Sequence, residues 1–174
     1  MSRVVVLVGM MGSGKTTVGR AVAARLGVGF IDTDDRVVAR TGKSVRDIFA
    51  SDGEAVFRAV ESQVLLDALD SQVDVVVAAA GGTVLSESNR AAIDAHADVV
   101  LWLDADVPTL GERAARGAHR PLLDGDIESR LAALDGERRA LYQSVADVRI
   151  DTRGKDIEEV VHEVVVALAK EPAS

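Results

Sequence analysis

The sequence predicts an α/β protein in which helices cover a parallel β-sheet. Short apolar runs alternate along the chain with longer amphipathic stretches, which is typical of this class. The run at 75–79 is apolar throughout, as expected for a central strand buried on both faces. The chain has 174 residues and shows no repeat, low-complexity linker or break between domains, so we expect one domain spanning 1–174.

The individual elements follow from this alternation. A first strand runs into a glycine-rich turn, and a helix begins near Lys15. Pro108 lies where the first turn of a later helix would begin, a position that tolerates the missing N–H group. The predicted strands are 3–8, 29–31, 74–79, 98–103 and 147–150. The predicted helices are 15–26, 34–41, 44–51, 54–70, 88–95, 107–116, 126–144 and 156–169.

Composition limits the classes of function. The net charge of −8 argues against nucleic acid as the main partner. No apolar run approaches the ~20 residues that cross a bilayer, and the first apolar run is too short for a signal peptide. There is no cysteine, which fits a protein without disulfides. We therefore expect a cytoplasmic protein with no membrane partner. A monomer is expected as well.

A glycine-rich segment follows the first predicted strand directly. Residues 9–16 match G-x-x-x-x-G-K-[ST] between an apolar strand and a helical pattern, the context that this phosphate-binding loop requires. Glycines let backbone N–H groups turn toward phosphate oxygens, and a helix N-terminus favours the same anion. Lys15 would neutralise the β- and γ-phosphates, and the Thr16 hydroxyl would help to hold Mg²⁺. The residues predicted to bind a nucleoside triphosphate here are Gly12, Ser13, Gly14, Lys15, Thr16 and Thr17.

The phosphate-binding loop leaves the class of nucleotide-binding protein open. A GTPase switch is disfavoured, because Asn89 is the only asparagine and Arg90 follows it, so the guanine-reading N-K-x-D motif is absent. An acid at a strand end would help to hold the metal, and both Asp32 and Asp104 occupy such positions. We favour Asp32, although it could instead cap the helix that follows it, and Asp104 and Asp106 could both be caps of the helix that begins near Pro108.

Two segments are longer than simple connections require. Residues 32–70 hold several short helices between the second and third strands, and residues 116–126 are rich in glycine, proline and charge. Long insertions in a compact domain are usually functional. In an open parallel sheet both would extend from the carboxyl edge, where ligands bind. We therefore expect a substrate-binding insertion at about 32–70 and a lid at about 116–126.

The motifs together resemble those of the shikimate kinase family, and the resemblance covers nearly the whole chain. It rests on the order and spacing of the phosphate-binding loop, Asp32-Thr33-Asp34, Asp47-Ile48-Phe49, Gly53 to Arg58, Gly81-Gly82, Arg120 to Leu123, and Arg138 four residues before Tyr142. The resemblance implies a P-loop NTPase of the nucleoside-monophosphate-kinase-like type, a three-layer α/β/α fold with a five-stranded parallel sheet. It also implies transfer of the ATP γ-phosphoryl group to the 3-hydroxyl of shikimate in aromatic amino-acid biosynthesis, with Mg²⁺ as cofactor.

The same resemblance implies roles for the acid-binding residues. Asp34, Arg58, Gly81, Gly82 and Arg138 would contact shikimate. Asp34 would hold ring hydroxyls and orient the attacking hydroxyl, so it is a catalytic candidate. Arg58 and Arg138 would clasp the carboxylate, because a planar guanidinium pairs well with that group.

On the nucleotide side, the resemblance implies that Arg120 is a lid arginine that reaches the transferring phosphate. Arg120 and Lys15 are therefore catalytic candidates as well as ATP-binding ones. Arg113, Arg153 and Lys155 would lie near the adenine. One departure is Ala80, which stands where the family usually has the first of three glycines.

Each role has a simpler alternative. Arg58 could pair only with Glu54 or Glu61 on its own helix, and Arg138 could be a solvated charge on a polar helix face. Arg120 could be an ordinary surface charge. The nearest rival activity is that of a gluconate kinase, whose substrate is also a hydroxylated acid. A nucleotide-gated regulatory protein without catalysis is the alternative from another class.

Overall fold

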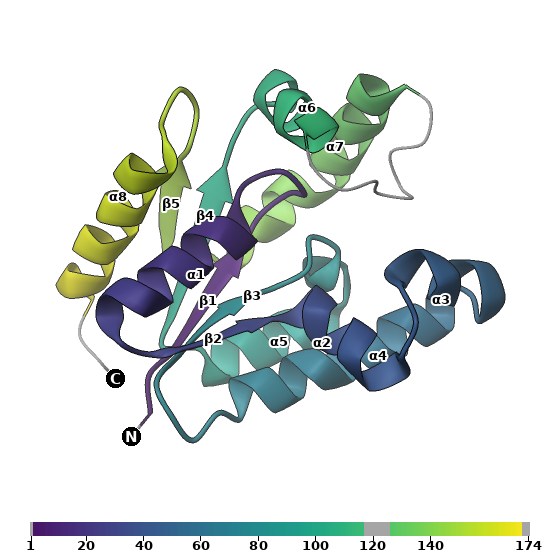
Figure 1. Cartoon of the computed structure of the whole chain (residues 1–174), viewed down its shortest axis with the longest axis horizontal. Coiled ribbons are helices and arrows are strands. Elements are labelled where there is room, and N and C mark those ends of the chain that lie inside the picture. The colour runs from purple at the N-terminus through teal and green to yellow at the C-terminus, as the bar shows by residue number, and fades with distance from the viewer. Residues whose placement is uncertain (1, 117–125, 172–174) are drawn as a thin grey trace.

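Helices cover both faces of one parallel sheet in the computed structural model, which describes residues 2–116 and 126–171 (Figure 1). The strands are β1 (Val4–Val8), β2 (Gly29–Asp32), β3 (Val75–Ala78), β4 (Val99–Asp104) and β5 (Val148–Asp151). The helices are α1 (Lys15–Leu26), α2 (Thr33–Thr41), α3 (Val45–Ser51), α4 (Glu54–Leu69), α5 (Glu87–His96), α6 (Val107–Arg116), α7 (Ile127–Val145) and α8 (Ile157–Lys170). The predicted α/β class with a five-stranded parallel sheet is confirmed.

The strands lie in the order β2-β3-β1-β4-β5, which puts β1 at the centre. Val6 of β1 pairs with Val77 of β3 on one side and with Val100 of β4 on the other. Because the sheet is parallel, all strands end at the same edge. The loop after β1 therefore leaves the middle of that edge, between the segments that follow β3 and β4.

Side chains of β1 alternate between two cores, as the pleat of a strand requires. Val4, Val6 and Val8 pack with residues of α4, α5, α6 and α7 on one face. Val5 and Leu7 pack with α1 and α8 on the other face. The three layers follow directly from this burial of both faces (Figure 1).

The predicted insertion at 32–70 consists of α2, α3 and α4, and it has a small core of its own. Val37, Ile48, Phe57 and Val64, which come from these three helices, pack together and are almost fully buried. This cluster fixes α2 and α3 against α4, the helix that also packs on the sheet. The start of α2 and the exposed part of α4 are thereby held near the carboxyl edge.

Most predicted boundaries agree with the structure within one residue, and the differences have local causes. The helix expected at 34–41 begins at Thr33, because the Asp32 carboxylate accepts the first free backbone N–H groups. A short 3₁₀ helix, η1 (Thr83–Leu85), was not predicted. In the described residues, no helix combines the length and the apolarity needed to cross a bilayer.

Candidate functional site

The phosphate-binding loop adopts a backbone that requires glycine. Gly9 and Gly12 have φ values of 142° and 82°, in the region that other residues rarely adopt. A Cβ at Gly9 would lie 2.5 Å from the Leu103 carbonyl oxygen, and one at Gly12 would lie 3.0 Å from that of Leu110. The loop is therefore folded tightly against the end of β4 and against α6.

The loop leads into a helix N-terminus that is built for an anion. Gly14 caps α1 without a side-chain hydrogen bond, and the first turn of α1 has no acidic residue. The Ser13 hydroxyl is buried and has no hydrogen-bond partner in the described structure. The N–H groups that point out of a helix N-terminus, the helix dipole and the buried Ser13 hydroxyl all favour a bound phosphate here.

Lys15 and Thr16 lie at the start of α1 with defined contacts. The Lys15 ammonium donates to the carbonyl oxygens of Gly9 and Met10, at 2.7 and 2.9 Å. The Thr16 hydroxyl donates to Oδ2 of Asp32 at 2.6 Å. The other oxygen, Oδ1, accepts from the Asp34 N–H at 2.9 Å. Asp32 thus caps α2 and reaches Thr16 at once, so its two predicted roles do not exclude each other.

Thr16 and Asp32 together offer oxygen ligands of the kind that Mg²⁺ prefers. No group of three acidic, histidine or cysteine residues that could hold a metal occurs within 2–116 and 126–171. Magnesium in nucleotide sites is usually held by one or two protein oxygens plus phosphates and water. The pair fits that kind of site.

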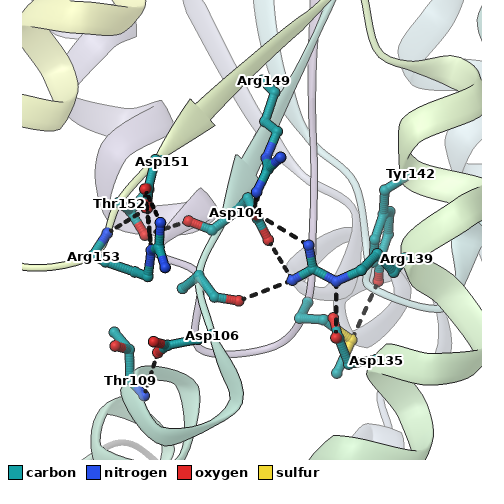
Figure 2. A network of polar contacts seen from close by, with 12 residues as sticks. Asp104, Asp106, Thr109, Asp135, Arg139, Tyr142, Arg149, Asp151, Thr152 and Arg153 are labelled. Atoms are coloured by element: carbon teal, nitrogen blue, oxygen red, sulfur yellow. Dashed lines mark hydrogen bonds and ion pairs between the residues drawn. The ribbon is translucent and has the colours of Figure 1, made fainter.

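Asp104, the other candidate metal acid, is engaged elsewhere, as Figure 2 shows. Its carboxylate is almost fully buried and accepts from Arg139 Nη2 and Arg149 Nε, both at 2.9 Å. The expectation that Asp104 caps the next helix is wrong. The same expectation for Asp106 is confirmed, because its carboxylate accepts from the Thr109 N–H at 3.0 Å at the start of α6.

A cavity of about 610 Å³ opens beside the phosphate-binding loop. Its walls come from the loop, α1, α6, the segment after β5 and the start of α8. They include Gly12, Ser13, Gly14, Thr16, Thr17, Val18, Arg113, Thr152, Lys155, Asp156, Ile157 and Val160. A space of this size next to the loop could hold the remainder of a nucleotide.

The basic residues expected near this cavity differ in their placement. Arg113 lines it and donates to Thr152, and Lys155 lines it and pairs with Glu163 at 2.7 Å. Arg153 does not line the cavity. Its guanidinium pairs with Asp151 at 2.6 Å, an interaction that raises its pKa (Figure 2). Of the two basic residues in this segment, Lys155 is therefore the better placed to contact a ligand in this cavity.

A second, smaller cavity of about 90 Å³ brings the predicted acid-binding residues together. Its walls come from the phosphate-binding loop, α2, α3, α4, α7 and the segment after β3. They are Met11, Asp34, Phe49, Phe57, Arg58, Glu61, Ala80, Gly81, Gly82 and Arg138. Phe57 both lines this space and packs in the core of the insertion.

Arg58 is held by two carboxylates of its own helix. It donates to Glu54 at 3.2 Å and to Glu61 at 3.0 Å. Glu61 is almost fully buried, and burial raises the pKa of its carboxyl, while the Arg58 charge opposes that rise. Gly82 allows this arrangement, because a Cβ there would lie 2.3 Å from Arg58 Nη1. The ion pairs of Arg58 with Glu54 and Glu61, considered above as its only role, are therefore present. They hold Arg58 at the wall of the cavity.

Arg138 is not the solvated charge considered as an alternative. It is 3% exposed, and its Nε has no hydrogen-bond partner in the described structure. Four residues further along α7, the Tyr142 hydroxyl donates to the Gly81 carbonyl at 2.6 Å. Burial raises the pKa of Tyr142, so it stays neutral and remains a donor. This bond ties α7, and hence Arg138, to the segment after β3.

Several residues of the two cavities were not predicted from sequence. Met11 and Ile157 carry no motif signal, and the hydrogen bond from Arg113 to Thr152 depends on the folded structure. Ala80 has no positive φ value, and its N–H donates to Thr33 Oγ1 at 2.9 Å. A Cβ at this position is therefore accommodated.

The chain matches known proteins along almost its whole length. The family profile described as "Shikimate kinase" matches residues 11–169. A curated relative, the shikimate kinase of Symbiobacterium thermophilum, is 47% identical over 169 residues, covering 94% of this chain and 95% of its own. The chain belongs to the shikimate kinase family.

Solved structures agree with this membership. The shikimate kinase of Acinetobacter baumannii, in complex with shikimate, superposes with a TM-score of 0.93 at 31% identity, covering 100% of this chain and 97% of its own. A gluconokinase from Sinorhizobium meliloti gives a TM-score of 0.60 at 23% identity, which shows a shared fold alone. The chain is thus a P-loop kinase of the shikimate kinase family, a family of ATP-using enzymes.

One predicted element of the shikimate kinase site cannot be placed. Arg120 and most of the lid expected at 116–126 lie outside the described residues. Their roles stay predictions from the resemblance.

Proposed function

We propose that the chain transfers the γ-phosphoryl group of ATP to the 3-hydroxyl of shikimate, giving ADP and shikimate 3-phosphate. The observation that carries the proposal is the division of the phosphate-binding loop between two cavities. Met11 lines the smaller cavity and Gly12 the larger one. A nucleotide in the larger cavity and an acid in the smaller one would therefore meet at the loop that holds the phosphates.

The chemistry of the smaller cavity supports an acidic, hydroxylated substrate. Arg58 and Arg138 come from different helices and supply guanidinium groups that suit a carboxylate. Asp34 supplies an oxygen that could orient a ring hydroxyl and accept its proton. Gly81 and Gly82 also line this cavity, and the missing side chain of Gly82 leaves the space that the Arg58 guanidinium occupies. The relative from Acinetobacter baumannii is described in complex with shikimate, which is consistent with this assignment.

Phosphoryl transfer depends mainly on positioning and on stabilising charge at the phosphate oxygens. In this proposal Lys15 and the loop N–H groups bind the β- and γ-phosphates, and Asp34 orients the attacking hydroxyl. Thr16 and Asp32 would hold Mg²⁺, which when bound neutralises phosphate charge. Arg120 would add positive charge from the lid at 116–126. Closing that lid would exclude water, which competes with the hydroxyl as acceptor.

Several further assignments belong to the same proposal. Gly12, Ser13, Gly14, Thr16, Thr17, Arg113 and Lys155 would contact ATP, while Arg153 is the weakest of the predicted contacts because Asp151 holds it. We also propose that 32–70 is the acceptor-binding insertion of a single domain, and that the chain acts as a cytoplasmic monomer.

The test is ADP formation by purified protein with ATP and Mg²⁺, comparing shikimate, gluconate and no acceptor. The proposal expects turnover that depends on shikimate and is lost in Lys15→Ala. Turnover that depends on gluconate would keep the phosphate site but overturn the acid assignment. Tight ATP binding without turnover on either acceptor would favour a regulatory protein.

A further inference from the structure

A single residue holds both terminal nitrogens of the Arg113 guanidinium. Nη1 donates to the Thr152 hydroxyl oxygen at 2.9 Å, and Nη2 donates to the Thr152 carbonyl oxygen at 2.7 Å. Two bonds to one residue fix the plane of the guanidinium as well as its position. The contact joins α6 to the segment after β5, which lies 39 residues further along the chain.

Thr152 is itself fixed to the sheet edge. It is 1% exposed, and its N–H and hydroxyl both donate to the Asp104 carbonyl oxygen, at 2.8 and 2.9 Å (Figure 2). Because the hydroxyl proton is committed to Asp104, the hydroxyl oxygen presents its lone pairs to Arg113. A continuous set of hydrogen bonds therefore runs from the end of β4 through Thr152 to Arg113.

Arg113 and Thr152 both line the larger cavity, and α6 lies directly against the phosphate-binding loop at Gly12. A guanidinium whose terminal nitrogens are bound within its plane still has its faces available for a planar ligand. We propose that Thr152 is a positioning residue, which holds Arg113 in the orientation that binds the nucleotide. This inference rests on the proposed function in so far as the larger cavity is the ATP site.

The test uses two substitutions at Thr152 that differ in the hydroxyl. Thr152→Val keeps the shape and removes the hydroxyl, whereas Thr152→Ser keeps the hydroxyl and removes a methyl group. We expect T152V to weaken ATP and ADP binding about three- to tenfold, since one bond to a charged group is lost. T152S should bind both nucleotides as the unaltered chain does. Calorimetry without acceptor measures these affinities, so the test can be read even if shikimate is not the substrate.

A double-mutant cycle separates positioning from a general structural effect. In an Arg113→Met background there is no guanidinium to orient, so adding T152V should leave ATP binding unchanged. Equal weakening in both backgrounds would overturn the proposal, as would unaltered ATP binding by T152V alone. The KM for the acid acceptor should not change in T152V, and a parallel rise in both KM values would also count against it. If T152V does not fold, Thr152→Ala takes its place in the same cycle.

Discussion

The Thr16 hydroxyl donates a 2.6 Å hydrogen bond to the Asp32 carboxylate, although β3 lies between β2, which ends at Asp32, and β1, which leads to Thr16. Both residues therefore present oxygen atoms at one point of the carboxyl edge, beside the helix N-terminus that would receive the phosphates. Neither oxygen alone makes a metal site, but the pair can share a cation with the nucleotide.

We expect Asp32→Asn to raise the Mg²⁺ concentration needed for half-maximal activity by about ten- to a hundredfold. The neutral amide is a poorer ligand for a hard cation, but asparagine remains a good helix cap, so α2 should persist. A magnesium titration of initial rates measures the shift, and thermal unfolding checks the fold. An unchanged magnesium requirement would remove Asp32 from the metal site.

We expect Asp34→Asn to retain ATP binding and to lose turnover by about a hundred- to ten-thousandfold. The amide can still accept a hydrogen bond from the substrate but cannot take up its proton. Calorimetry with ATP and steady-state rates with shikimate separate the two effects. Normal turnover would show that the carboxylate has no part in orienting or deprotonating the hydroxyl.

Gly82→Ala should weaken binding of the acid through Arg58. The new Cβ would lie 2.3 Å from Arg58 Nη1, so the guanidinium must move away from the position that Glu61 sets. We expect the KM for shikimate to rise about tenfold while the KM for ATP stays the same. Gly136→Ala is the matched control, because nothing lies within 4 Å of its Cβ position in α7. A similar change in both variants would contradict this account.

The raised pKa of Glu61 predicts a pH dependence of stability. Burial raises this pKa in the folded chain above its ordinary value of 4.5, so folding favours the protonated carboxyl. Stability from this group is fully present below that ordinary value and is lost as the pH rises through the folded-state pKa. Gln at position 61 cannot ionise. The unfolding free energy of Glu61→Gln relative to the unaltered chain should therefore increase with pH across this window, as urea unfolding between about pH 4 and pH 8 would measure. A relative stability that falls with pH would contradict the sign of the shift.

Local sequence signals were sufficient for most of the fold. The phosphate-binding loop, the apolar strands and the caps at Asp32 and Asp156 are each set by neighbours within a few residues. Strand order and the contacts between residues far apart in the sequence could not be predicted from local signals. Arg149 contacts Asp104 because β4 and β5 pair in one particular register, which no short segment determines.

The site shows the same division. Motif spacing brought Asp34, Arg58 and Arg138 into one list of acid-binding candidates, and in the structure all three line one cavity. Spacing could not predict that Arg138 would be buried, because α7 is polar over much of its length and the burial comes from packing against the segment after β3. The hydrogen bonds that Arg113 donates to Thr152 likewise depend on where β5 ends.

The phosphate-binding loop contributes to both cavities, whose sets of lining residues do not overlap in the described parts of the chain. Half of the residues that line the smaller cavity come from the helices of 32–70, and the larger cavity is lined by the loop itself, α1, α6, the start of α8 and the segment after β5. Under the proposed function, a substitution in either set should therefore change the surroundings of one substrate and leave those of the other intact. Under that function, the same nucleotide-binding frame could serve other phosphoryl acceptors after changes confined to the lining of the smaller cavity, without redesign of the catalytic loop itself.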